Sequence, residues 1–550
     1  MSEQSKKQSF LGGAAILAGA VAVVKVIGAL YKLPLNNILG DVGKTYFQTA
    51  YEIYNVLLTV STAGLPLAIS KLTSQAHARG RENEKRKIFR AAIWLFFALG
   101  LIGSCLMFFG AQGLADFQRN SMAAAPIRAL APAVFCVCLL ACMRGYTQGQ
   151  GNMGPTAVSQ VLEALCKLGV GLPLAWYILK KTQEAGTAAQ LAAGSDGMEN
   201  VAAGAIFGVT VGTILSMVFL ILYLLRHRDN TPSDDVPRSG GYLLRRILAI
   251  GVPITLGNCA MSIITMIDTK IILGRLQSGL GLTEVAASAL KGQYSYAMDM
   301  LNMVASFVYP VTMSLIPFAA AALAQGDKRG ASRTVNSAFR VLALLALPAG
   351  VGLSVLSTPI MVLVLPAQRE GALAAGPHLR ILGIACIFVC LMILTNAILQ
   401  TYGKEHLPIF TVIAGGVVKI VMNYILVGNP NIGINGAPWS TLCCYGVIAG
   451  LNLFFVWKYS PRKPHYFRLF ARPVFASALM GLAAWAVCSL VGKLLSGHSA
   501  YGANAIATLC GILAGVAVYG VLVIALGLLR ADDVRNIRGG QKLIRLLHLR

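Results

Sequence analysis

Charged side chains inside long apolar runs are the residues of this chain best placed to do chemistry. Lys25 and Glu52 lie in the first two runs, and Asp268 and Asp299 lie in the seventh and eighth. A charge at the centre of a bilayer costs roughly 2.5–3.5 kcal/mol on insertion scales, so each needs a partner, a ligand or a wet cavity. With a cytoplasmic N-terminus, helical rise places all four at one level. We predict that they line the outer end of a cavity between two halves of the molecule.

Each of these charges also has an ordinary structural interpretation. Lys25 can extend to the outer interface, and Glu52 can simply pair with Lys25. Asp268 and Lys270 lie near the end of their run, where an interfacial position suits them, and Asp299 fits either interpretation. Two more cations are expected at the interface, where they can steer an anion, namely Lys32 and Lys291.

Two lysines lie in the middle of their runs. Glu163 precedes Lys167 by four residues, which is the favourable order for an ion pair on a helix, so we interpret Lys167 as structural. Four residues before Lys419 the chain has a glycine, Gly415, instead of a carboxylate. Lys419 is therefore the better candidate for a charge that faces a substrate or an ion.

No pattern in the chain indicates a catalytic residue, a cofactor or a metal site. The twelve cysteines all fall within apolar runs and form no loop-borne pair of the zinc-binding type. A nucleophile elbow and a phosphate-binding glycine loop are also missing. A membrane enzyme that builds glycans would need an external loop rich in His, Arg or carboxylates, and the predicted external loops carry only His378, His498 and few acids.

Composition places the chain among membrane proteins. Charged residues make up only 12% of it and hydrophobic residues 56%, whereas soluble proteins carry about 25% charged residues. The first run, 10–30, is too long for the core of a signal peptide, so we expect a retained helix.

Runs of about 20 apolar residues predict an all-α polytopic membrane protein with about fourteen transmembrane helices. The predicted helices are 10–30, 46–70, 88–110, 123–143, 157–179, 201–225, 247–272, 294–318, 339–365, 379–401, 409–427, 436–457, 470–491 and 503–529.

The basic residues predict the orientation. The chain has 46 Lys and Arg against 21 Asp and Glu, a net charge of +25. Most of these cations fall in loops and tails that are cytoplasmic if both termini are cytoplasmic, as the positive-inside rule favours. The basic tail 530–550 is expected to lie on anionic lipids of the cytoplasmic leaflet rather than to bind nucleic acid.

The sequence also indicates an internal duplication. One spacing separates Gln148 from Gln400, Gly151 from Gly403, and Lys167 from Lys419. We therefore predict an N-lobe of six helices at 1–225, a cytoplasmic linker at 226–246, a C-lobe of six helices at 247–460, and two further helices with a tail at 461–550. Such parallel repeats place substrate between the two lobes. Gly-x-Pro breaks at Gly64, Gly171 and Gly251 would let helices bend.

At this point the residues suggest a family. The segment 25–72, with STAGLPLAISKL at its end, and KGQYSYAMDMLNM at 291–303 resemble stage V sporulation protein B-like members of the multidrug/oligosaccharidyl-lipid/polysaccharide (MOP) exporter superfamily. The resemblance implies a MATE-like fold and the flipping of undecaprenyl-pyrophosphate-linked sugars, such as lipid II or a polysaccharide repeat unit, by alternating access across the bacterial inner membrane. It also implies cell-wall synthesis proteins as partners.

Related lipid II flippases hold the pyrophosphate with arginines on helices one, two and eight. Lys25 aligns with one such position, and Tyr31 or Lys32 lies near another, whereas Glu52 replaces the base on helix two. The alternative function is a cation-coupled multidrug exporter of the same superfamily, which Glu52, Asp268 and Asp299 would suit.

Overall fold

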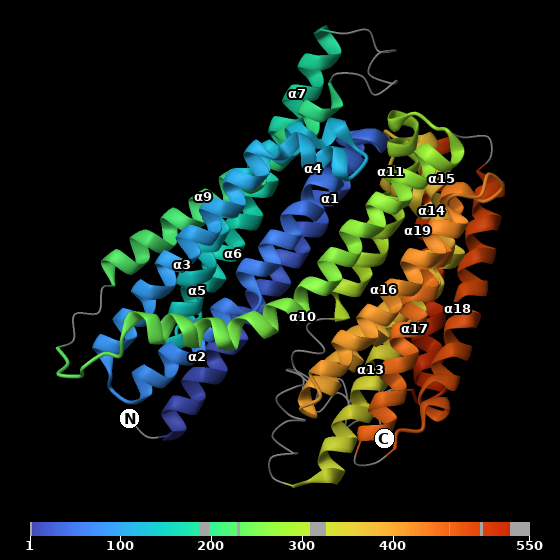
Figure 1. Ribbon diagram of the computed structural model, residues 1–550. Helices are drawn as coiled ribbons and strands as arrows, with labels where there is room; N and C mark the ends of the chain where they lie inside the picture. Colours follow the sequence, from blue (N-terminus) through green and yellow to red (C-terminus); the bar gives the residue numbers. More distant parts are fainter. Residues whose placement is uncertain are drawn as a thin grey trace. The chain divides into compact units, whose positions relative to one another are not determined.

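The computed structural model describes residues 3–185, 197–227, 232–308, 326–460, 463–495 and 499–528, and all regular structure within these ranges is helical. The chain packs as two compact units, Met1–Gly292 and Gln293–Arg550. Figure 1 shows their helices in sequence colours. The predicted basic tail lies outside the described residues, as does the end of the eighth predicted run.

The expected helical membrane architecture is confirmed. Among the described residues, eleven helices are long and apolar enough to cross a membrane, or twelve if the bent α10 counts as one span. One of the eleven contains both the first and the second predicted helices. The number fourteen therefore stays a prediction.

The first unit is built from long helices joined by short turns. Its helices are α1 (Glu3–Thr62), α2 (Leu65–Ala78), α3 (Glu82–Phe109), α4 (Ala111–Phe117), α5 (Ala124–Gly149), α6 (Gly154–Cys166), α7 (Leu172–Ala185), α9 (Met198–Arg226) and α10 (Gly240–Gly274), with a 3-10 turn at Ser121–Ala123 and π-helical turns at Lys167–Gly171 and Arg275–Gly279. α11 (Glu284–Ser306) begins in this unit and continues into the second.

α5 forms the centre of the first unit. It is apolar around most of its circumference, and such helices are buried. It packs against α1, α2, α3 and α9, and its cysteines, Cys136, Cys138 and Cys142, are all buried and free. These three cysteines act as small apolar side chains, as their sequence context predicted.

α1 differs from the prediction. The sequence predicted one helix that ends at residue 30 and a second that starts at residue 46, but the chain stays helical between them. The only break is a kink at Gly40, whose φ of 60° and ψ of −177° suit glycine. Lys25 therefore lies about 22 Å before the kink, at 1.5 Å per residue, and its predicted place near the outer end of its helix is wrong.

Two of the predicted Gly-x-Pro breaks meet in space. Helix α1 ends before Gly64, which is the N-cap of α2, and the Gly64 N–H donates to Thr255 Oγ1 of α10 at 3.2 Å. A Cβ at Gly64 would collide with the carbonyl oxygen of Gly251, and one at Gly251 would collide with Leu65. Small residues thus permit close backbone approach between α2 and α10.

The linker before α10 docks on the start of α3. Asp235 accepts hydrogen bonds from the backbone N–H groups of Asn83 and Glu84, both at 2.9 Å. The N-cap residue itself, Arg81, makes no side-chain cap. A residue from a distant part of the chain therefore satisfies the free donors of this helix end.

The second unit has the same helical character. Its helices are α13 (Lys328–Val355), α14 (Ser357–Val364), α15 (Arg369–Thr401), α16 (His406–Leu426), α17 (Gly436–Tyr459), α18 (Tyr466–Leu494) and α19 (Ala500–Ala525), with a 3-10 turn at Gly433–Asn435. The run predicted as one helix at 339–365 is divided at Leu356 into α13 and α14. α18 and α19 pack side by side (Figure 1).

One turn has the same geometry in both units. The turn after α5 places Gly151 at φ 81°, and the turn after α15 places Gly403 at φ 70°. The N–H of Gly151 donates to the Gln148 carbonyl and that of Gly403 to the Gln400 carbonyl, both at 2.9 Å. The same geometry also occurs at Gly80 and Gly527, so the duplication stays a prediction. The division into lobes at 226–246 stays a prediction.

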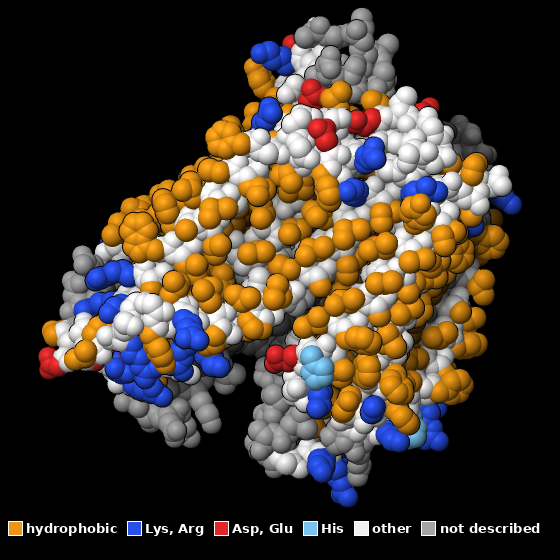
Figure 2. Space-filling view, viewed as in Figure 1, with side chains coloured by type: hydrophobic (Ala, Val, Ile, Leu, Met, Phe, Trp, Pro, Cys, Tyr) orange, Lys and Arg blue, Asp and Glu red, His pale blue; other side chains and the backbone are white. Residues whose placement is uncertain are grey.

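The surface has the composition of a membrane protein. Figure 2 shows broad hydrophobic bands over the middle of each unit, with Lys and Arg gathered toward the helix ends. Exposed aromatic and aliphatic side chains include Trp94, Phe109, Leu482 and Leu513. Apolar surface of this extent suits contact with lipid.

Candidate functional site

The first unit brings three of the predicted charges together. Glu52 on α1 is buried, and its Oε1 accepts a hydrogen bond from Gln48 Nε2 at 3.1 Å. Lys291 of α11 and Asp268 of α10 both lie close enough to interact electrostatically with the Glu52 carboxylate. Lys291 thus interacts with Glu52 electrostatically, an interaction that the sequence did not suggest.

A small cavity with a mixed polar and apolar lining lies beside this carboxylate. It has a volume of about 150 Å³ and is lined by Glu52, Asn55 and Thr59 of α1 and by Met261, Ser262 and Thr265 of α10. Two of the lining side chains interact directly, since Thr59 Oγ1 and Ser262 Oγ are 3.0 Å apart and share a hydrogen bond. A cavity of this size and polarity holds water or a hard cation with oxygen ligands, but not a sugar headgroup.

Lys25 and Lys32 occupy one side of α1. They are seven residues apart, which is two helical turns, and they interact with each other electrostatically. Lys25 is exposed and Lys32 is half-buried. The sequence carries no carboxylate between residues 10 and 39. Two cations on one side of a helix can bind a group with two negative charges, such as a pyrophosphate.

Lys270 has an aromatic partner. Its Nζ stands 3.4 Å from the centroid of the Phe117 ring on α4, a cation–π contact. This contact favours the interfacial role that was the ordinary interpretation of Lys270.

Lys167 belongs to an ion network in the first unit. Its Nζ lies 3.1 Å from Glu163 Oε1, and the other oxygen of Glu163 lies 3.4 Å from Arg144 of α5. Arg144 Nε also donates to Ser159 Oγ at 2.9 Å. The predicted Glu163–Lys167 pair is confirmed. Arg144 was missed because it lies on another helix.

The second unit holds Asp299 and Lys419, and both are buried. Gly415, where the first repeat has Glu163, has no room for a side chain, because a Cβ there would collide with Ile448 of α17. Close helix packing at Gly415 therefore leaves no space for a carboxylate side chain like that of Glu163. How these two charges lie relative to those of the first unit stays a prediction.

A chain of polar side chains in the second unit was not predicted. Thr411 Oγ1 donates to Asn452 Oδ1, and Asn452 Nδ2 donates to Asn396 Oδ1, both at 2.8 Å. Each residue comes from a different helix, α16, α17 and α15. The sequence does show asparagines within apolar runs. It does not show that they form hydrogen bonds with each other, because that depends on how the helices pack.

Lys44 is a further buried cation outside the predicted set. It lies just after the kink of α1, and its Nζ donates to Asn36 Oδ1 at 2.9 Å. The predicted helices 10–30 and 46–70 leave Lys44 in the loop between them, where a lysine is an ordinary residue. Among the described residues no group of three or more His, Cys, Asp or Glu could hold a metal ion.

Comparisons with known proteins agree with this architecture. A family model described as polysaccharide biosynthesis protein matches residues 10–322, and a model described as MatE matches residues 253–425.

Three relatives from Bacillus subtilis match almost end to end. They are an uncharacterized membrane protein, YabM (26% identical, covering 98% of this chain and 96% of the relative), stage V sporulation protein B (23%, 96% and 98%) and lipid II flippase MurJ (24%, 96% and 97%).

Solved structures share the fold. The inward closed conformation of lipid II flippase MurJ superposes with a TM-score of 0.66 at 14% identity, over 93% of this chain and 99% of the other. An inward-facing multidrug resistance MATE transporter of the MOP superfamily superposes with a TM-score of 0.60 at 15% identity, over 82% and 98%.

Proposed function

Because this chain belongs to the polysaccharide biosynthesis protein family, whose model covers more than half of it, we propose that it is a flippase for undecaprenyl-pyrophosphate-linked sugars. The substrate is lipid II or a polysaccharide repeat unit, and it crosses the inner membrane by alternating access without chemical conversion. Stage V sporulation protein B and lipid II flippase MurJ, which match it over nearly their whole length, support this function.

The observation that carries the proposal is the pair of cations on one side of α1. Lys25 and Lys32 lie close enough to interact, and like charges at this spacing repel. An anionic pyrophosphate between them removes that repulsion and provides charge-assisted hydrogen bonds. A transported organic cation would be repelled from this face.

The test is a reconstituted flipping assay. Proteoliposomes with the wild-type protein should move a fluorescent lipid II analogue across the bilayer. The K25A/K32A variant should lose at least about tenfold in rate, because charge-assisted hydrogen bonds contribute roughly 1.5–3 kcal/mol each. The K25R/K32R variant, which keeps both charges, should retain most of the activity.

Lys181→Ala, an exposed lysine of α7, serves as the matched control and should leave flipping unchanged. Equal activity of wild type and K25A/K32A would remove the two lysines from the site. Complete absence of lipid flipping by the wild type would reject the proposed substrate.

The second candidate is a cation-coupled multidrug exporter. It is favoured by the buried carboxylates of Glu52 and Asp268 in the first unit and by the MATE-like fold. Competition separates the two functions: lipid-linked precursors should inhibit a flippase, and organic cations should inhibit a drug exporter.

A further inference from the structure

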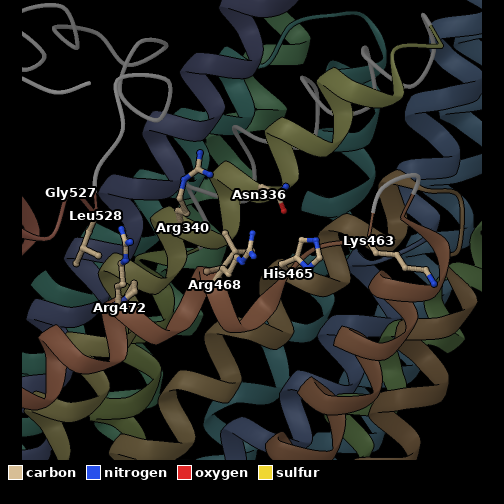
Figure 3. Close-up of a pocket in the computed structure, with 10 residues that line it drawn as sticks. Asn336, Arg340, Lys463, His465, Arg468, Arg472, Gly527 and Leu528 are labelled. Atoms are coloured by element: carbon tan, nitrogen blue, oxygen red, sulfur yellow. The ribbon is translucent and has the colours of Figure 1, made fainter.

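A cavity in the second unit lies beside one helix and the ends of two others. It has a volume of about 290 Å³ and is bordered by α13, the start of α18 and the chain just after α19. Five of the side chains that line it are basic, namely Arg340, Lys463, His465, Arg468 and Arg472, and none of its described lining residues is acidic. Figure 3 shows Arg340, Arg468 and His465 facing the same space, with Arg472 on one side and Lys463 farther away on the other.

The two arginines of α18 are not neutralised within the described residues. Arg468 and Arg472 are exposed and four residues apart, a spacing at which like charges destabilise a helix. None of the ion pairs among the described residues involves either arginine. The N-terminus of α18 adds the positive end of its dipole, and its N-cap, His465, makes no side-chain cap. The site therefore has an excess of positive charge that an anion would relieve.

Aromatic and basic side chains near the cavity indicate the level of a membrane interface. Lys463 Nζ lies 4.0 Å from the ring centroid of Trp457, and Lys404 and Lys458 lie 5.1 and 5.7 Å from that of Tyr459. Trp, Tyr and Lys concentrate where headgroups meet the hydrocarbon core. The distribution of Lys and Arg among the predicted loops places this end of α18 at the cytoplasmic leaflet.

An apolar stripe continues from the arginines along α18. Phe475, Leu479 and Leu482 follow Arg472 at intervals of three or four residues, which keeps them on the same side of the helix. They are 57%, 36% and 62% exposed. The side of α18 that carries two arginines at its end thus carries exposed apolar groups for the next three turns. This matches the two parts of a phospholipid, an anionic headgroup and an acyl chain.

We propose that this cavity binds the phosphate of an anionic glycerophospholipid from the cytoplasmic leaflet, with one acyl chain along the apolar stripe of α18. Basic pockets at the ends of membrane helices recognise such headgroups. The volume of the cavity lies at the lower end of the range for ligand sites, about 300–1,000 Å³. It suits a phosphate with its glycerol better than the large sugar-bearing headgroup of the proposed transport substrate.

Native mass spectrometry of the full-length protein in detergent tests the proposal. Phosphatidylglycerol should bind to the wild type more tightly than phosphatidylcholine, whose choline cancels the phosphate charge. The R468Q/R472Q variant should bind phosphatidylglycerol about tenfold more weakly. R468K/R472K should retain most of the affinity, because it keeps the charges.

The matched control is R329Q/R333Q. Arg329 and Arg333 are exposed on α13, have the same spacing of four residues and do not line the cavity. This variant should bind phosphatidylglycerol like the wild type. An equal loss in both double variants would show general surface electrostatics and overturn the proposal.

Competition experiments against bound phosphatidylglycerol identify the kind of molecule that supplies the phosphate. Sodium phosphate that displaces phosphatidylglycerol at equal concentration would assign the cavity to soluble anions. Undecaprenyl pyrophosphate that binds there in preference to phosphatidylglycerol would assign it to the transport substrate. Either result overturns the proposal. If R468Q/R472Q does not fold, the preference of the wild type for phosphatidylglycerol over phosphatidylcholine and sodium phosphate still decides it.

Discussion

Glu52 is the residue whose surroundings best separate a structural from a coupling role. A carboxylate that only balances Lys291 needs no space around it, yet Glu52 borders a cavity that Asn55, Thr59, Ser262, Thr265 and Met261 also line. Oxygen ligands of this kind suit Na⁺ or a hydrated proton site. A coupling role for Glu52, as opposed to a structural one, stays a prediction.

Replacement of Glu52 by Gln should flatten the dependence of transport on pH, sodium or membrane potential. The amide keeps the shape and the hydrogen bond from Gln48 but removes the charge that binds a cation. Transport in proteoliposomes with imposed gradients measures the effect. Gln48→Ala is the control, because it removes only the neighbouring hydrogen bond. A gradient dependence equal to that of the wild type would leave Glu52 as a structural partner.

At the scale of single residues, the sequence could predict pairs on one helix but not pairs between helices. The Glu163–Lys167 contact follows from a spacing of four residues. The ion pair of Arg144 with Glu163 and the electrostatic interaction of Lys291 with Glu52 join different helices, and no spacing along the chain encodes them.

At the scale of helices and turns, the free N–H groups at the N-termini of α3 and α13 are capped in two different ways. α13 is capped by its own Asp327, which accepts from the N–H groups of Arg329 and Gly330 at 3.1 and 2.8 Å. α3 has Arg81 at that position, and Asp235 of the linker takes over the same role. The linker is thereby attached to the first unit, because its carboxylate completes a helix end.

Asp235→Ala should release the linker. Loss of a helix cap costs about 0.5–2 kcal/mol, so thermal stability should fall modestly, and trypsin should cleave faster after Arg238. Cleavage rates and melting of the purified protein measure the effect. Asp234→Ala is the matched control, since Asp234 is the adjacent exposed carboxylate, and should change neither. Equal cleavage of the two variants would show that the cap does not hold the linker.

The stabilisation by Asp235 should depend on pH. Partial burial opposes ionisation, but hydrogen bonds from Ser233 and the N–H groups of Asn83 and Glu84 outweigh it and lower the pKa of Asp235. The contribution is therefore present above the ordinary Asp pKa of about 3.9 and is lost as the pH falls through the lowered folded-state pKa.

At the scale of the whole molecule, the distribution of charge predicts the orientation. The cationic loops that include Arg79 and Arg81 belong on the cytoplasmic side, and the uncharged loop 428–435 belongs outside. A green fluorescent protein fused to the C-terminus should fluoresce, because it folds in the cytoplasm. Alkaline phosphatase inserted within 428–435 should be active, and the same insertion after Ala78 should be inactive. The reverse pattern would invert the proposed topology.

The sequence by itself determined that the chain is helical, spans a membrane many times and belongs near the MOP exporters. A long apolar run that crosses lipid must form a helix, and such runs can be read directly from the sequence. Only the tertiary structure decided where α1 bends, that Gly64 meets Gly251, and which charges become neighbours. These features depend on contacts between residues far apart in the chain, and local composition does not encode the rotation of one helix against another.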